Sequence, residues 1–373
     1  MRDVHAIVTQ WMHSAGMTVR VDAAGNLRGV YRSGRPTQAR RLVIGSHLDT
    51  VPNAGAFDGI LGVMLAVALV EQLEGRSYPY AIEAVGFSEE EGVRFNAPFI
   101  GSRAFIGSLD AALLDRRDAN GESVRDAIRQ YGLDVDHLDS ATAAPESAGF
   151  LEFHIEQGPV LDSLNLPLAV VDAITGLTRC EVVFEGEANH AGTTPMAGRR
   201  DALAAAAEWV VQVERLARET PQLVATVGRV IAEPGASNVI PGRCRATLDL
   251  RHRDDTQRHE SFKVLANLAH TIGITRGVRV SIEPKLNQKS MPMDASMTAG
   301  LTAAMEKCGY PVHRMASGAG HDAMIVASRM PVAMLFVRSP RGISHHPDET
   351  VRVDDVAAAL RVGAAYLEAF ANA

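Results

Sequence analysis

The sequence predicts an α/β protein: a catalytic domain with a mostly parallel central sheet flanked by helices, plus an inserted α+β domain. Two observations support this fold class. Near the N-terminus, compact apolar strands at residues 41–46 and 80–87 alternate with an apolar helix at 59–73, as in parallel α/β sheets. After Gly176 the pattern changes to alternating strand segments around one long helix, which is typical of an α+β domain.

The chain of 373 residues exceeds the usual size of one domain, so we expect two domains with separate cores. We place the first part of the catalytic domain at residues 1–176, the inserted domain at 177–290 and the second part of the catalytic domain at 291–373. Residues 121–149 show a weaker pattern, which indicates surface helices and a loop. The later elements that we expect are strands at 179–185, 224–230, 244–251, 278–282 and 332–337, and a helix at 201–220.

Composition excludes several classes of function. A net charge of −7 without a basic cluster argues against a nucleic-acid partner. The longest apolar run, residues 60–70, is far shorter than the roughly 20 residues of a membrane span, so we expect a buried helix and no membrane partner. Residues 1–5 lack the features of a secretory signal, which predicts a cytoplasmic protein. Cys180, Cys244 and Cys308 are scattered and form no C-x-x-C pair, which predicts buried free thiols.

Metal-binding side chains gather in four patches near the ends of predicted strands, where open α/β sheets place their sites. The first patch covers residues 45–52 and 55–59. His47 offers a neutral imidazole, and Asp58 offers two carboxylate oxygens that can bridge two cations. Asp49, two residues after His47, is expected to accept the other imidazole N–H. Taken alone, this patch fits a structural histidine equally well.

The second patch, residues 88–94, reads Ser-Glu-Glu-Glu-Gly-Val-Arg and follows an apolar strand. Three adjacent carboxylates repel one another, and a pair of cations would neutralise them. One Glu can then coordinate while its neighbour takes a proton from water as a general base. A solvated acidic turn is the alternative interpretation of this patch alone.

The third and fourth patches complete a set large enough for two ions. Residues 153–159 place His154 and Glu156 on one face of a strand and leave Gln157 near a Gly-Pro turn. Residues 342–349 carry two adjacent histidines in a loop bounded by Gly and Pro. Because a di-metal site needs about six bonds from His and carboxylate side chains, four such patches in one chain predict a metal centre.

The motifs GSHLDTVPNAGAFDG, SEEEGVRF, HIEQGPVL, NHAGTTPM, SNVIPG and SHHPDE run in one order along nearly the whole chain. In this they resemble the amidase/hydantoinase/carbamoylase branch of the zinc aminoacylase and carboxypeptidase superfamily. The resemblance implies two divalent ions per subunit, zinc or manganese, with cobalt or nickel as alternatives. It makes Glu90 the base. The implied ligands are His47, Asp58 and His154 for one ion and Asp58, Glu91 and His345 for the other.

Two of these assignments depend on details of the family pattern. In S-H-x-P-x-E the first histidine is the ligand and the second fills a variable position, so His345 is chosen over His346. At the position of His154 the peptidase relatives tend to carry a carboxylate, whereas the ureido-cleaving branch has H-I-E-Q-G. The resemblance therefore favours ureido hydrolysis over peptide cleavage.

The resemblance extends to the inserted domain. His190 matches the family histidine that hydrogen-bonds the substrate carbonyl where the oxyanion develops. Asn238 and Arg251 match the pair that grips the substrate carboxylate, for which the planar fork of Arg is well suited. Gln157 and the loop that starts at Gly318 match the pocket wall.

The loop after Gly318 also contains His321 and Asp322, which are interpreted as pocket wall or as structural groups behind it. In relatives the inserted domain forms the dimer contact and closes over the site, so the resemblance implies a homodimer through this domain. The chain also begins partway into what looks like the family's first helix, so we expect a leading segment to be missing or the start to be late.

The predicted function is hydrolysis of the ureido C–N bond of N-carbamoyl-L-amino acids or of allantoate, with release of ammonia and carbon dioxide. Glu90 would deprotonate a water activated by the two ions, and His190 would stabilise the oxyanion. The alternatives are a metallo-aminoacylase or dipeptidase and, in another class, a non-catalytic metal-binding dimer that senses a ureide. The intact Glu90 argues against the last of these.

Overall fold

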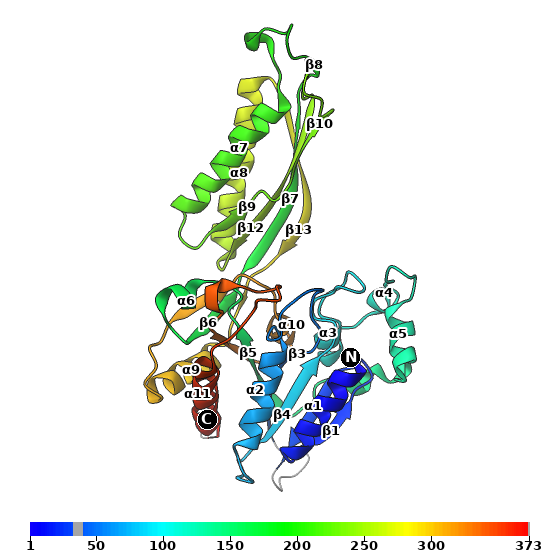
Figure 1. Ribbon diagram of the computed structural model, residues 1–373, viewed down its shortest axis with the longest axis vertical. Coiled ribbons are helices and arrows are strands. Elements are labelled where there is room, and N and C mark those ends of the chain that lie inside the picture. The colour runs from blue at the N-terminus through cyan, green and yellow to red at the C-terminus, as the bar shows by residue number, and fades with distance from the viewer. Residues whose placement is uncertain (33–39, 372–373) are drawn as a thin grey trace. The chain divides into compact units, whose positions relative to one another are not determined.

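The computed structural model describes residues 1–32 and 40–371. The chain divides into two compact units, which Figure 1 draws with their elements labelled. Unit 1 comprises Met1–Asp172 and Met293–Ala373, and unit 2 comprises Ala173–Pro292. Each unit is described by itself below.

A mixed sheet of mostly parallel inner strands forms the middle of unit 1, and its strand order is β1-β2-β4-β3-β5-β16-β6, with β15 beside β6. The inner strands β4, β3, β5 and β16 are mutually parallel, while β2 and β6 flank them in antiparallel pairing. Both faces of β3, β4 and β16 are buried, which explains their almost continuous apolar sequences. The bounds are β1 Thr18–Val21, β2 Leu27–Tyr31, β3 Arg41–His47, β4 Ala81–Phe87, β5 Ser147–Ile155, β6 Leu168–Ile174, β15 Arg314–Ser317 and β16 Val332–Val337.

Helices cover both faces of this sheet, which confirms the predicted α/β class. Four helices share one apolar core with the sheet: α1 Arg2–Ser14, α2 Ile60–Glu71, α9 Ala295–Lys307 and α11 Val353–Phe370. Helix α2 contacts both the sheet and α11, so its apolar residues point in all directions, as predicted for the run at 60–70. The remaining elements are α3 Ile100–Phe105, α4 Ala111–Leu114, α5 Val124–Tyr131, η1 Val135–Ala141, α6 Val160–Leu164, α10 Asp322–Val326 and η3 Pro340–Gly342.

Unit 2 is an antiparallel sheet with two long helices on one face. The strand order is β10-β12-β7-β13, with β9 beside β12. The helices α7 and α8 enclose a core in which Trp209 is fully buried. A separate two-stranded ribbon joins β8 to β11. The bounds are β7 Gly176–Glu185, β8 Asn189–His190, η2 Met196–Gly198, α7 Ala202–Glu219, β9 Val224–Thr226, β10 Val230–Glu233, β11 Val239–Ile240, β12 Arg243–His252, α8 Asp255–Arg276, β13 Arg279–Gln288 and β14 Met291–Pro292.

Two predicted strands of unit 2 differ from the structure. The strand expected at 224–230 is two short strands separated by residues 227–229. Between them, Arg229 donates from its N–H to the hydroxyl of Thr247 and accepts from the N–H of Thr247. Strand β13 does not end at 282 but runs to Gln288, with a register shift between Pro284 and Leu286. A proline is tolerated there because β13 is an edge strand.

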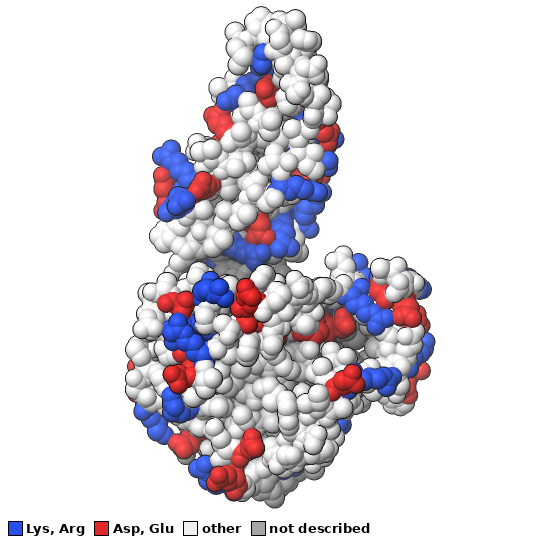
Figure 2. All heavy atoms as spheres, in the orientation of Figure 1, with Lys and Arg blue, Asp and Glu red and all other residues white. Residues whose placement is uncertain are grey.

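The distribution of surface charge and the burial of the three cysteines can be compared with the predictions from the composition. On the face drawn in Figure 2, basic and acidic side chains lie near one another on both units. Cys180 and Cys244 are buried free thiols as predicted, whereas Cys308 is half-buried. Within residues 1–32 and 40–371, no helix is both long and apolar enough to cross a membrane.

Candidate metal and catalytic site

The predicted patches meet at one edge of the unit 1 sheet. Strand β3 ends at His47, β4 ends just before residues 88–91, and β5 carries His154 near its end. Strand β16 leads into the loop that contains His345. Because β3, β4, β5 and β16 are parallel, their carboxyl ends lie along the same edge, where open α/β sheets place their sites.

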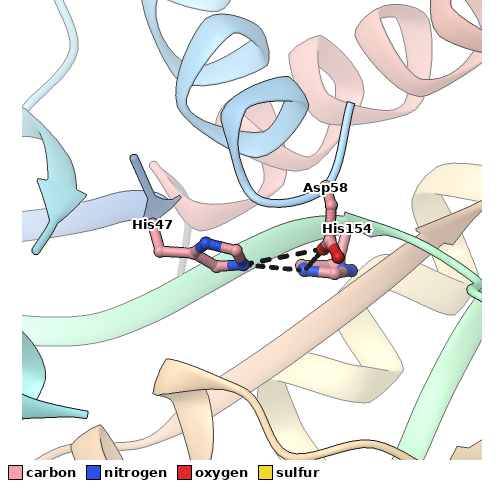
Figure 3. A group of neighbouring side chains, drawn as sticks. All are labelled: His47, Asp58 and His154. Carbon is pink, nitrogen blue, oxygen red and sulfur yellow. Dashed lines mark hydrogen bonds and ion pairs between the residues drawn. The ribbon is translucent and has the colours of Figure 1, made fainter. Parts of the chain in front are cut away.

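The first ligand group consists of His47, Asp58 and His154, which point toward one another in Figure 3. Their potential ligand atoms all lie within 4.8 Å of one another. Asp58 Oδ1 lies 3.6 Å from His47 Nε2 and 3.2 Å from His154 Nε2, and the two Nε2 atoms are 3.4 Å apart. All three side chains are buried.

Backbone carbonyls select the tautomer of both imidazoles. His47 Nδ1 donates to the carbonyl of Asp49 and His154 Nδ1 donates to the carbonyl of Ile155, both at 2.9 Å. In the neutral form of each ring, Nε2 therefore carries the lone pair and faces Asp58. This corrects one expectation: the acceptor for His47 is the backbone carbonyl of Asp49, because the carboxylate lies 3.8 Å from Nδ1 and is engaged elsewhere.

The second ligand group consists of Asp58, Glu91 and His345. His345 Nε2 lies 3.0 Å from Asp58 Oδ2 and 3.4 Å from Glu91 Oε1. His345 has a φ of 54°, in the left-handed region that non-glycine residues seldom adopt, so its loop must hold it there. His346 is exposed and lies near Asp348 instead, which agrees with the choice of His345.

Buried oxygens without donors show that these groups fit divalent cations. Asp58 Oδ1 and Glu91 Oε1 are buried and have no hydrogen-bond partner among the described residues. An unpaired buried carboxylate oxygen is costly. A divalent ion would satisfy the oxygens and the imidazoles together. Asp58 belongs to both groups, so it is the residue that could bridge two ions.

Electrostatics keep Asp58 ionised. Burial raises the pKa of Asp58, but the imidazoles of His154 and His47 outweigh burial and hold this pKa below its usual range. For His47, burial lowers the pKa, yet Asp58, Glu90 and Asp49 outweigh burial and hold the pKa well above 6.5. The group therefore holds a strongly anionic bridge beside imidazoles that a cation could deprotonate.

Glu90, the base expected from the sequence, lies beside the first group. Its side chain is buried, and its Oε2 lies 4.0 Å from His47 Nε2. Burial raises the pKa of Glu90 well above its ordinary value. A carboxyl with a raised pKa accepts and returns protons near neutral pH, which suits general acid–base catalysis.

Asp49 fixes the backbone of this acidic turn. Its Oδ1 accepts from the N–H of Glu90 and its Oδ2 accepts from the N–H of Glu91, both at 3.0 Å. Glu89, the residue before them, has a φ of 54°, so the turn is strained. From the sequence Asp49 was expected to bind His47, whereas its carboxylate in fact binds the backbone of Glu90 and Glu91.

Two further site residues from the sequence lie in unit 1. Gln157 donates from Nε2 to Asp58 Oδ2 at 3.0 Å, and its φ of 58° is also left-handed. The Gln157 amide thus lies at the candidate centre, where an incoming substrate could compete for it. At Gly318 an added Cβ would meet no atom within 4 Å, so this glycine borders open space.

A buried polar layer lies behind His154. His321 is in edge contact with the His154 ring at 4.4 Å and hydrogen-bonds Ser317 Oγ through Nε2. Glu152 accepts from Ser46 Oγ and from the N–H of Ala323. His321 was recognised from the sequence, whereas Glu152 was missed. The only feature of the sequence that could have indicated Glu152 is a carboxylate between two apolar residues of a strand.

The neighbour of His321, Asp322, has no exposed surface, and burial raises its pKa well above the ordinary value. His321 and Asp322 are therefore buried groups behind the ligands, as one of the two interpretations expected.

In unit 2, His190 and Asn238 lie together. His190 is exposed and pairs with Val239 across the β8–β11 ribbon, and the carbonyl of Asn238 accepts from the N–H of Ala191. Arg251 lies near the other end of β12, where its Nε and Nη2 bind the two carboxylate oxygens of Asp249 at 2.7 and 3.0 Å. The fork predicted for a substrate carboxylate thus already binds a carboxylate of the protein.

Histidines and carboxylates gathered around one shared aspartate at the carboxyl edge of a parallel sheet are typical of metal-dependent hydrolases. Residues 43–369 match the family described as Peptidase family M20/M25/M40, and the chain belongs to this family.

Similar proteins indicate which members of this family the chain resembles. The chain is 40% identical to an N-carbamoyl-L-amino acid amidohydrolase of Geobacillus stearothermophilus, over 95% of this chain and 88% of that protein. It is 36% identical to an allantoate amidohydrolase of Bacillus subtilis, over 93% and 85% of the two chains. A crystal structure of a hydantoinase/carbamoylase family amidase from Burkholderia ambifaria superposes with a TM-score of 0.91 at 34% identity, covering 98% of this chain and 89% of that one.

Proposed function

We propose that this protein hydrolyses the ureido C–N bond of an N-carbamoyl-L-amino acid or of allantoate. The observation that carries the proposal is the position of Asp58, which belongs to both ligand groups and has a buried oxygen without a donor. The names of the similar amidohydrolases supply the substrate class. Water would add to the ureido carbonyl, and the products would be ammonia, carbon dioxide and the amine.

His47, Asp58 and His154 would hold one ion, and Asp58, Glu91 and His345 the other. When bound, a pair of divalent ions lowers the pKa of water and polarises the carbonyl of the substrate. We expect zinc or manganese, with cobalt or nickel as substitutes, because His and carboxylate ligands accommodate all four.

The chain's own residues would move the proton and hold the substrate. Glu90 takes the proton from the attacking water and returns it to the departing nitrogen. His190 donates to the oxygen that becomes negative, and Asn238 and Arg251 bind the substrate carboxylate. For Arg251 to do so, the substrate carboxylate must displace or share the pairing with Asp249.

Cleavage of acyl or peptide bonds is the alternative activity. The family that the chain matches is described as a peptidase family. Against this alternative, His154 stands where the peptidase relatives tend to carry a carboxylate. A ureide sensor without catalysis would not need a buried base such as Glu90.

The deciding experiment measures ammonia release from metal-loaded protein offered N-carbamoyl-L-amino acids, β-ureidopropionate and allantoate in parallel. N-acetyl amino acids and dipeptides serve as controls, with amine release as the readout. Ammonia from a ureido substrate supports the proposal. Turnover of the acyl controls alone would favour an aminoacylase or dipeptidase, and no turnover with any substrate would favour a sensor.

We also propose a homodimer that contacts through the inserted domain. His190 and Asn238 lie beyond the Arg243 end of β12, whereas Arg251 lies eight residues further along, or about 26 Å at the rise of a strand. A ureido carboxylate is only a few bonds long. One copy of unit 2 therefore cannot bring both sets to the same substrate, and a second chain would supply one of them.

A further inference from the structure

We propose that Glu349 is a positioning residue that ties the loop of Asp58 to the loop of His345 and so assembles the second ligand group. This inference rests on the proposed two-ion centre. Glu349 lies 291 residues after Asp58 in the chain, and this residue is only 5% exposed.

The carboxylate of Glu349 binds both loops at once. Its Oε1 accepts from the backbone N–H groups of Phe57 and Asp58, both at 3.0 Å. Its Oε2 accepts from the hydroxyl of Ser344 at 3.0 Å, next to His345 in the chain. One side chain therefore fixes the backbone of one proposed ligand and the flank of another.

Packing leaves the Asp58 loop little freedom against this side chain. A Cβ added to Gly55 would lie 2.2 Å from Glu349 Cβ, so the loop backbone lies directly on the glutamate. Any other residue at position 55 would push the two loops apart. Close backbone approach is a common reason for a glycine at such a position.

The strained backbone of His345 needs this support. Its left-handed φ of 54° persists only where neighbouring contacts over-determine it. Glu349 contributes twice, because its N–H also donates to the carbonyl of His346 at 3.0 Å and closes the turn. Without the carboxylate, the turn loses its link to Ser344 and to the Asp58 loop.

The two ligand groups depend on Glu349 to different extents. In the group of His47, Asp58 and His154, only Asp58 lies in a loop that Glu349 binds. The group of Asp58, Glu91 and His345 uses both loops that Glu349 joins. Loss of Glu349 should therefore weaken the second ion more than the first.

The test titrates metal-free protein with Zn²⁺ or Mn²⁺ and measures the number of ions bound and the Kd of each. We compare the unaltered chain with Glu349→Ala, Glu349→Gln and Ser344→Ala. In Glu349→Ala the Kd of the second ion should rise about 10- to 100-fold, the usual cost of losing a group that orients a ligand, and the first Kd should rise less. Glu349→Gln keeps an acceptor for both N–H groups and should remain within about threefold of the unaltered protein.

A second readout needs no metal. Hydrogen exchange in the metal-free protein should speed up at the amides of Phe57 and Asp58 in Glu349→Ala but not in Ser344→Ala, which removes only the Oε2 contact. If Glu349→Ala does not fold, Ser344→Ala decides, and the inference expects a smaller but selective rise in the second Kd.

Asp294→Ala is the matched control for stability. Asp294 caps α9 by accepting from the N–H of Met297 at 2.9 Å, and its own N–H bonds Val332 at the far end of β16. Its loss should lower the midpoint temperature of unfolding and leave ion binding unchanged. If this variant lost the second ion as readily as Glu349→Ala, general destabilisation would explain the loss in both variants, and the inference would be overturned.

The outcomes separate the two proposals. An unaltered protein that binds fewer than two ions overturns the proposed centre, whatever the variants do. An unaltered protein that binds two ions, with unchanged second Kd and unchanged amide exchange in Glu349→Ala, overturns the role of Glu349 alone.

Discussion

The carboxylate of Asp49 accepts a hydrogen bond from the backbone N–H of Glu90 at 3.0 Å, through one of its two oxygens. Its other oxygen accepts from the N–H of Glu91 at the same distance. One side chain, just after a neighbouring strand, therefore fixes the backbone of both the proposed base and the proposed ligand.

Asp49→Ala should release this turn. We expect the activity or the metal affinity to fall about 10- to 100-fold, because Glu90 and Glu91 lose their common anchor. Asp49→Asn retains one acceptor oxygen and should lie between the alanine variant and the unaltered protein. The measurements are kcat/KM for the ureido substrate and metal content after dialysis. Equal kinetics in all three proteins would reject this role.

Glu90→Gln should separate catalysis from metal binding. The amide cannot take a proton from water, so kcat should fall by about 10² to 10⁴. The ligand groups do not include Glu90, so the ion content should stay at the level of the unaltered protein. Kinetics and metal analysis on one preparation test both statements. A variant with undiminished kcat would rule out Glu90 as the base.

Most of this candidate centre could be predicted from the sequence because its candidate ligands lie in short, recognisable motifs. His47 ends one apolar strand and Glu91 lies four residues after another, so their meeting at one sheet edge followed from parallel pairing. Their grouping into two sets was an implication of the family resemblance, and the distances now agree with it.

Groups that act through contacts between distant segments could not be predicted in this way. Glu349 binds backbone N–H groups of Phe57 and Asp58, and no local pattern links positions so far apart. The role of Asp49 was misassigned for the same reason: its partners lie on the next strand, whereas proximity in sequence suggested His47. Glu152 was missed because its neighbours in the strand, Leu151 and Phe153, are apolar.

The adjacent histidines offer a matched pair of variants. His345→Ala should remove one ligand from the second group and lower the ion content from two toward one, with a large loss of kcat. His346→Ala should leave both nearly unchanged, because this side chain is exposed and lies near Asp348 rather than Asp58. Metal analysis and kinetics compare the two. The reverse pattern would transfer the ligand role to His346.

Metal affinity should rise with pH. In the metal-free protein, burial raises the pKa of Glu91, and carboxylates hold the pKa of His47 well above 6.5. Both side chains keep a proton to higher pH than free side chains do, and both must lose it to bind an ion. The affinity should therefore still increase above pH 6.5, the ordinary value for imidazole, until His47 is deprotonated.

Calorimetric titration in buffers of different ionisation enthalpy measures this effect as protons released per ion. The release should be larger near about pH 6 than near about pH 8, because fewer protons remain to be displaced at the higher pH. A pH-independent affinity without proton release would contradict the assigned ligands.

The proposed dimer makes a prediction about mixtures of inactive variants. His190→Ala and Arg251→Ala should each lower kcat/KM strongly, by about 10²-fold or more for the oxyanion donor. If the two residues reach one substrate from different chains, a mixed dimer contains one site with both residues intact and one site with neither. Random exchange of subunits would then restore about a quarter of the activity of the unaltered protein, since half of the dimers are mixed and half of their sites are complete. If both residues came from one chain, every site in the mixture would lack one of them. Activity that stays at the level of the separate variants, although native mass spectrometry shows mixed dimers, would therefore exclude the shared site.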